Sequence, residues 1–138
     1  MKLMNMSNFA VDTNILVYSH DQNVGSKLDI ARDLIVKSPV VSTQAVSEYI
    51  NVLKRVMKIP KQQIFSTCLP NLKRCNIFKV DTATLQSADY LIQRYDFQLF
   101  DAIIVASALE AGCKTLYSED MQHNMKIDRQ LTIINPFV

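Results

Sequence analysis

The sequence predicts a three-layer α/β fold, in which a central parallel sheet of four to five strands is covered by helices on both faces. Short, mostly apolar runs alternate with amphipathic helical patterns along the chain. The runs lack polar alternation, which is typical of strands buried on both faces. With 138 residues, of which 49% are hydrophobic, residues 1–138 are expected to form a single domain with a substantial core.

Five apolar runs are predicted as strands. They are residues 9–11 (FAV), 40–43 (VVST), 77–80 (IFKV), 115–118 (TLYS) and 131–135 (LTIIN). Strands that alternate with helices pair in parallel through right-handed crossovers. The carboxyl ends of these strands are therefore expected at one edge of the sheet, where ligands of such folds bind.

Helices are predicted between the strands. Ser26 and Asp81 are expected to cap two of them, Pro60 to open a third, and Pro70 to kink or split it. The last, DAIIVASALEAG, is apolar nearly all round and is expected to be buried and to end at Gly112. The side chains predicted to face inward on the other four helices are Leu28, Ala31, Leu34, Ile35, Val46, Tyr49, Ile50, Leu53, Val56, Met57, Ile64, Cys68, Leu72, Leu85, Ala88, Leu91, Ile92 and Tyr95.

The cysteines and the apolar runs indicate a cytoplasmic protein. Cys68, Cys75 and Cys113 are odd in number and form no C-x-x-C motif, so they predict core thiols in a reducing compartment rather than disulfides or a zinc site. No apolar run reaches the roughly 18 residues of a membrane span. The N-terminus also lacks the pattern of a signal peptide.

Acidic side chains follow the predicted strands. Asp12 and Asp120 come directly after the first and fourth strands, and Glu119 adjoins Asp120. Glu48 lies in the first turns of the helix after the second strand, and Asp101 opens the most apolar helix. Each has a structural alternative: a helix cap for Asp12 and Asp101, a solvated helix residue for Glu48, and a turn residue for Asp120. Their coincidence at one sheet edge favours a site.

Four carboxylates at one edge repel each other unless a cation neutralises them. An all-oxygen site favours Mg²⁺ or Mn²⁺ over zinc or copper. The two glycines, Gly25 and Gly112, exclude a P-loop and a dinucleotide fingerprint. His20 and His123 have no metal-ligand spacing, and Asn14 stands where a haloacid-type phosphatase needs a second aspartate.

A cluster of basic residues offers a second candidate feature. The net charge of +2 is small, so any nucleic-acid partner requires a local basic patch. Lys54, Arg55, Lys58 and Lys61 lie within eight residues of one another and are candidates for phosphate contacts. A solvated helix end is the alternative interpretation of this run.

Four motifs together resemble the PIN domain family. They are VDTN (11–14), SEY (47–49), FDAIIVASAL (100–109) and LYSEDMQH (116–123). The likeness is strongest to the toxins of VapBC-type toxin–antitoxin pairs and spans nearly the whole chain. It implies a PIN-like fold and a Mg²⁺- or Mn²⁺-dependent endoribonuclease.

Carried over by motif, the family's four acids are Asp12, Glu48, Asp101 and Asp120, and Glu119 also fits the last position. Thr13 and Asn14 follow the first acid as in many members, and Ser118 matches a supporting hydroxyl residue. The resemblance also implies a homodimer and a small antitoxin protein that blocks the site. The alternative is an acidic-pocket α/β binding module that is regulatory or has lost catalysis.

Overall fold

A mostly parallel sheet forms the centre of the computed structural model, which describes residues 8–138. The strands are β1 (Phe9–Val11), β2 (Val40–Ser42), β3 (Asn76–Phe78), β4 (Thr115–Tyr117), β5 (Lys126–Ile127) and β6 (Leu131–Ile134). They lie in the order β3-β2-β1-β4-β6-β5. The neighbours from β3 to β6 are parallel, and β5 pairs with β6 in the antiparallel sense.

The predicted α/β class is therefore confirmed, with a sheet of six strands instead of four to five. The five predicted runs all form strands, and their ends shift by a residue or two. The sixth strand, β5, is only two residues long and carries no apolar period, so no sequence pattern distinguishes it from a turn.

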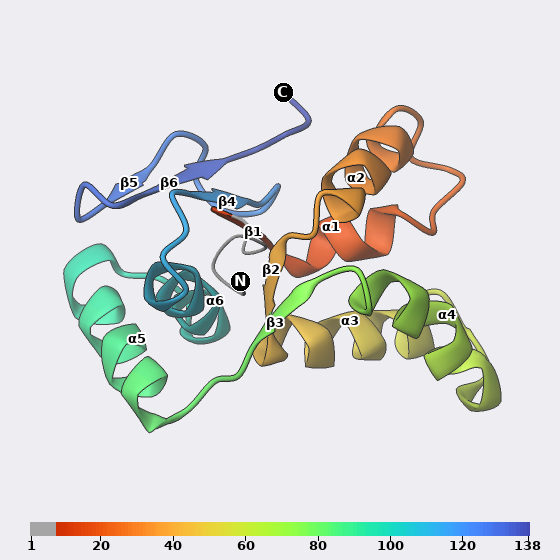
Figure 1. Ribbon diagram of the computed structural model, residues 1–138, viewed down its shortest axis with the longest axis horizontal. Coiled ribbons are helices and arrows are strands. Elements are labelled where there is room, and N and C mark those ends of the chain that lie inside the picture. Colours follow the sequence, from red (N-terminus) through yellow and green to blue (C-terminus); the bar gives the residue numbers. More distant parts are fainter. Residues whose placement is uncertain (1–7) are drawn as a thin grey trace, which may run out of the picture.

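The helices divide between the two faces of the sheet. They are α1 (Thr13–Tyr18), α2 (Lys27–Val36), α3 (Thr43–Arg55), the 3₁₀ turn η2 (Lys61–Gln63), α4 (Ile64–Leu72), α5 (Thr82–Tyr95) and α6 (Leu99–Glu110). In Figure 1, α5 and α6 lie on one side of the sheet and α1 to α4 lie on the other. The longest, α5, has 14 residues, and no helix among residues 8–138 is long and apolar enough to cross a bilayer.

The order in which the chain adds strands to the sheet reverses beside β1. The chain moves from β1 to β2 and β3, and then returns through α5 and α6 to β4 on the other flank of β1. Right-handed crossovers then place the two groups of helices on opposite faces. Connections therefore diverge at the carboxyl ends of β1 and β4, and such a divergence leaves a crevice there.

Helix α6 is buried because its sequence is apolar on every side. All residues from Ala102 to Ala108 are buried between the sheet and α5. The helix begins at Leu99, so Asp101 stands in its first turn at the margin of the core. The fold thus carries a carboxylate to the crevice on its most apolar element.

Several helix details differ from the sequence predictions. Val56 and Leu85, predicted to face inward, are 71% and 48% exposed. Val56 lies past the last turn of α3. In α5, Ala88 and Leu91 are buried as predicted, and Thr84, which forms a capping box with Asp81, is buried in addition. Helix α4 continues through Pro70 without splitting. Ser26 precedes α2, but its side chain makes no capping hydrogen bond, and Pro60 precedes η2.

A buried polar network joins α1, α3 and α4. The Tyr49 ring is fully buried, and its hydroxyl lies 2.5 Å from His20 Nε2 and accepts a hydrogen bond from Asn71 Nδ2 at 3.1 Å. Asn71 Nδ2 also donates to Ser19 Oγ at 2.8 Å. Because Ser19 and His20 directly follow α1, the network fixes α1 against the helix that carries Glu48.

We expect Tyr49→Phe to lower the free energy of unfolding by about 1–3 kcal/mol, because it leaves buried polar partners without the hydroxyl. Tyr90→Phe is a matched control. Its ring is 49% exposed and its hydroxyl donates to Asp128 at 3.2 Å near solvent, so we expect a loss below about 0.5 kcal/mol. Urea unfolding measures both, and equal losses would show that the network does not stabilise this helix packing.

Candidate active site

Asp12 is a buried carboxylate with both oxygens held in place. It is 4% exposed and caps α1, where its Oδ1 accepts a hydrogen bond from the Thr13 amide at 2.7 Å. Its Oδ2 accepts a hydrogen bond from Ser118 Oγ, at the end of β4, at 2.8 Å. The capping role and the site position are therefore compatible, because each uses a different oxygen.

The register of the sheet brings these two strand ends together. Val11 pairs with Tyr117, and the Asp12 amide donates to the Tyr117 carbonyl oxygen at 2.9 Å. On its other side β4 pairs with β6, and the Ser118 amide continues that ladder by donating to the Ile134 carbonyl oxygen at 2.9 Å. Strand β4 ends at Tyr117 and α1 begins at Thr13, so residues 118–120 follow β4 directly beside the start of α1.

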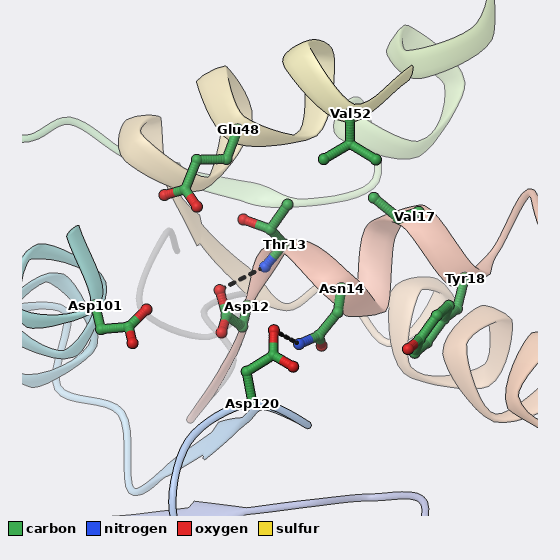
Figure 2. Close-up of a pocket in the computed structure, with 9 residues that line it drawn as sticks. All are labelled: Asp12, Thr13, Asn14, Val17, Tyr18, Glu48, Val52, Asp101 and Asp120. Carbon is green, nitrogen blue, oxygen red and sulfur yellow. Dashed lines mark hydrogen bonds between the residues drawn. The ribbon is translucent and has the colours of Figure 1, made fainter. Parts of the chain in front are cut away.

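Four carboxylates from four segments line one cavity of about 250 Å³. Figure 2 shows Asp12 at its centre, with Glu48 coming from α3, Asp101 from α6 and Asp120 from the loop after β4. The other residues of its wall are Thr13, Asn14, Val17, Tyr18 and Val52. The structure thus brings together all four acids predicted from the sequence, although it does not by itself give them a role.

Hydrogen bonds position two of the outer acids. Asn14 Nδ2 donates to Asp120 Oδ2 at 3.1 Å, and Gln44 Nε2 donates to Glu48 Oε2 at 3.0 Å (the first is drawn in Figure 2). Asn14 follows Asp12 by two residues on α1, so one short helix sets the places of both Asp12 and Asp120. Gln44 precedes Glu48 by one turn of α3.

Burial and like charge raise the pKa values of three of the acids. Burial raises the pKa of Asp12 to about 6, the bonds from Ser118 and Thr13 oppose this, and the charges of Asp101 and Asp120 add to it. Burial also raises the pKa of Glu48, and the charge of Asp12 raises it further. The pKa of Asp101 is raised by burial and by the charges of Glu48 and Asp120. No basic residue is among the nine that line the cavity. No lining residue therefore supplies a positive charge that would offset the four carboxylates.

Glu119 lies outside this cavity, although the sequence left it equivalent to Asp120. Its carboxylate accepts hydrogen bonds from the Tyr18 hydroxyl and from Lys27 Nζ. Lys27 Nζ also lies 5.1 Å from the Tyr18 ring centre and 5.5 Å from that of Phe137. Burial alone would raise the pKa of Glu119, but the Lys27 and Tyr18 contacts together lower it. Asp120 is the acid of this turn that reaches the cavity.

The Thr13 hydroxyl is a further polar group at the cavity. Thr13 is 8% exposed, and its Oγ1 is buried with no hydrogen-bond partner among residues 8–138. Buried hydroxyls without a partner are uncommon and costly. Since Thr13 lines the cavity, a bound ion with its water, or a phosphate oxygen, is the kind of ligand that would satisfy it.

The residues fit a hard divalent cation in chemistry. Carboxylates with raised pKa values and a spare hydroxyl form an oxygen-only donor set, which Mg²⁺ and Mn²⁺ prefer. Within residues 8–138, no three acidic, histidine or cysteine side chains are arranged closely enough to hold a metal ion as they stand. An ion there would be held by one or two of these carboxylates with water as its other ligands, or the outer acids would have to move towards Asp12.

A family model described as the PIN domain matches residues 9–126. The chain belongs to the PIN domain family. The match covers all four acids and the cavity-lining helices α1, α3 and α6, so the family resemblance of the sequence motifs is confirmed.

Solved structures with this PIN fold come from several bacteria. Mycobacterium tuberculosis VapC20, described as a toxin that cleaves the sarcin-ricin loop, has a TM-score of 0.65 at 18% identity over 81% of this chain and 89% of its own. A toxin–antitoxin complex from Klebsiella pneumoniae has a TM-score of 0.66 at 22% identity, and the match covers 92% of this chain and 97% of that chain. VapBC2 of Rickettsia felis, bound to a DNA fragment from its promoter, has a TM-score of 0.67 at 19% identity, and the match covers 91% of this chain and 96% of that chain. No curated protein matches the chain.

Sequence reasoning missed the apolar side of the cavity and the partners of Glu119. Val17 and Tyr18 lie on the six-residue helix α1, whose extent the sequence did not predict, so their position beside Asn14 was not predicted either. Lys27 belongs to none of the sequence motifs, so its contact with Glu119 was not predicted either. The basic residues Lys54, Arg55, Lys58 and Lys61 are exposed and do not line the cavity.

In metal-free buffer we expect Asp12→Asn to stabilise the fold at about pH 8. An acid whose pKa rises on folding stabilises the fold while protonated, and that stabilisation is lost as pH rises through the folded pKa. The difference between 3.8 and about 6 corresponds to roughly 3 kcal/mol, so a gain of about 1–3 kcal/mol is expected, and it should vanish near pH 4.

Urea unfolding in the presence of a chelator measures this effect. Asp33→Asn, on the exposed surface of α2, is the control and should leave the free energy of unfolding unchanged at both pH values. A destabilised Asp12→Asn variant at high pH would contradict the buried, uncompensated charge. If this carboxylate holds a divalent cation, added Mg²⁺ should stabilise the wild type and not the variant.

Proposed function

We propose that this PIN domain is a Mg²⁺- or Mn²⁺-dependent endoribonuclease that hydrolyses RNA phosphodiester bonds. One observation carries the proposal: four carboxylates, three of them with raised pKa values, converge on a cavity whose walls hold no basic residue. Such a site favours a divalent cation and, through it, a phosphate. Membership of the PIN family and likeness to VapC20 support RNA as the substrate.

The four acids would share the work of binding and orientation. Asp12 and Asp101 are proposed as direct ligands, because Asp12 is fixed by two hydrogen bonds and Asp101 stands across the cavity on the rigid α6. Glu48 and Asp120 are proposed to bind directly, to bind through water or to orient the attacking water. When bound, the ion lowers the pKa of that water and stabilises charge on the phosphate oxygens.

The remaining polar residues would support these acids. Ser118 and the Thr13 amide hold Asp12, and Asn14 holds Asp120. Such partners orient metal ligands and are often needed for tight binding. Glu119 is proposed as a structural anchor of the same turn, because Lys27 and Tyr18 hold it outside the cavity.

The exposed basic residues at the end of α3 are proposed to bind the RNA backbone. Lys54 and Arg55 occupy the last turn of the helix that carries Glu48, and Lys58 and Lys61 follow it. Arg55 lies seven residues after Glu48, which is two helical turns, and therefore stands about 10.5 Å along the axis on nearly the same face of α3. A strand of RNA whose phosphate reaches the acids can therefore continue along this surface.

We further propose that the protein is the toxin of a VapBC-type pair, with a small antitoxin protein as its partner, a homodimeric state and a cytoplasmic location. The similar structures include a toxin–antitoxin complex and a VapBC pair bound to DNA from its promoter. Co-expression with the product of an adjacent small reading frame tests the partner: that product should co-purify and suppress cleavage.

We expect Asp12→Asn and Asp101→Asn each to lower the rate of RNA cleavage by roughly 100-fold or more, since removing even a supporting partner of a metal ligand costs about 10–100-fold. A chelator should abolish cleavage by the wild type, and added Mg²⁺ or Mn²⁺ should restore it. The measurement is cleavage of a mixed single-stranded RNA, with the folded state of each variant checked by circular dichroism.

Glu119→Gln is the matched control for Asp120→Asn. The two neighbours carry the same charge, but only Asp120 lines the cavity, so Glu119→Gln should lose less than about tenfold and Asp120→Asn more. The opposite order would reverse their assignment. Unchanged cleavage in the Asp12 or Asp101 variant would overturn the assignment of that acid. Absence of cleavage by the wild type with Mg²⁺ or Mn²⁺ would leave the acidic-pocket binding module as the explanation.

Replacing Lys54, Lys58 and Lys61 together with Gln should weaken RNA binding and reduce its dependence on salt. Each phosphate contact on a single strand contributes roughly 0.7 to the slope of log K against log salt, so the slope should fall by up to about 2. The metal-induced thermal shift should be unchanged. The matched control replaces Lys114, Lys126 and Arg129, which are exposed near the opposite end of the sheet. An equal loss in the control would show that binding depends on total charge and not on this surface.

A further inference from the structure

A second cavity, of about 210 Å³, shares Asp101 with the acidic one. Its wall comes from the end of α5, from residues 96–98 that lead into α6, and from the turn at residues 121–125 that follows Asp120. A ligand group in this cavity would therefore lie next to anything bound by the acids. The proposed function gives no role to it.

The cavity has apolar and aromatic walls that are already fixed. Phe97 and Tyr95 lie with ring centres 6.1 Å apart, and Met121 is only 8% exposed beneath the turn. The Tyr95 hydroxyl donates to Asp128 Oδ1 at 2.6 Å and accepts from the Asp128 amide at 3.0 Å, which holds the ring in place. Met125 completes this wall.

Two exposed amide side chains stand at the same cavity. Gln98 precedes α6 but makes no capping hydrogen bond with its side chain, and Gln122 lies in the turn beyond Met121. A glutamine amide presents a donor and an acceptor side by side, and that pattern matches the edge of a nucleobase.

We infer that this cavity binds the base of a nucleotide next to the scissile phosphate of the RNA. The inference rests on the proposed function. The Phe97 ring and the methionine sulfurs offer surfaces on which a base stacks, whereas the Arg94 guanidinium lies over the Tyr95 ring, 5.2 Å from its centre. The glutamine amides then distinguish one base edge from another, as proteins do with unstacked RNA bases. The subsite thereby selects where the RNA is cut.

The charge and size of the cavity favour a base over other ligands. None of its described lining residues is basic, and Asp96 and Asp101 are acidic, so a phosphate or a carboxylate is disfavoured there while a neutral base is not. Its volume of about 210 Å³ lies below the roughly 300–1,000 Å³ of pockets that enclose drug-sized ligands. One planar ring system suits that space.

The test uses short single-stranded RNAs that share one cleavage position and differ in the base on either side of it, including an abasic residue. We expect the wild type with Mg²⁺ to cut the abasic RNA about tenfold or more slowly at one flanking position, as expected for the loss of one stacked base. Gln98→Ala with Gln122→Ala should reduce the differences among the four bases while the penalty for the abasic residue remains.

Phe97→Leu should instead reduce the penalty for the abasic residue, because it keeps apolar volume and removes the ring. Gln93→Ala is the control, since Gln93 is exposed on α5 and outside the cavity. The glutamine variant keeps the test valid if Phe97→Leu unfolds, because both glutamines are exposed. The thermal shift caused by Mg²⁺ should be the same in all variants, which separates a subsite from damage to the metal site.

Two outcomes overturn the inference in different ways. Equal cleavage of abasic and intact RNAs at both flanking positions, or base preferences unchanged in the glutamine variant, would overturn the subsite and leave the ribonuclease proposal standing. Failure of the wild type to cleave any RNA, together with failure of Asp12→Asn to bind it, would overturn the proposed function and the subsite with it.

Discussion

The buried carboxylate of Asp12 is the constraint on which the rest of the site depends. It is held by the Thr13 amide and by Ser118 Oγ, yet its pKa rises to about 6 because burial outweighs both bonds. A carboxylate in this position costs stability unless positive charge reaches it. The positions of Glu48, Asp101 and Asp120 increase that cost, and a bound cation would turn the same arrangement into a source of affinity.

The fold creates this position through its topology. Because the chain reverses its progress across the sheet beside β1, the connections leaving β1 and β4 diverge and open a crevice between them. Asp12 starts α1 on one side of the crevice and Asp120 follows β4 on the other, while the apolar α6 brings Asp101 to the same cavity. Helix packing and sheet order thus set the distances between acids that lie far apart in the sequence.

The sequence was sufficient for the acids but not for their surroundings. Strand ends that meet at one edge made the convergence of Asp12 and Asp120 predictable, because parallel pairing fixes where both strands stop. Glu119 and Asp120 were equivalent in sequence, since adjacent residues in a turn face different ways and only tertiary contacts with Lys27 and Tyr18 decide which. The second cavity combines Tyr95 at the end of α5 and residues 96–98 with the turn at 121–125. The two connecting segments carry no periodic pattern, and no local rule predicts that they meet.

Glu119 and Asp120 also show how the chain distributes its charge. Lys27 neutralises Glu119 outside the cavity, whereas none of the residues that line the cavity supplies a cation to Asp120 or Asp12. The contrast between these neighbours is informative, because a lysine a few ångströms further in would have relieved the acids and stabilised the fold. The described residues instead leave the compensation to a ligand, which links folding stability to whatever binds there. Such a trade of stability for a charged, unsatisfied site is what functional sites require of an otherwise well-packed core.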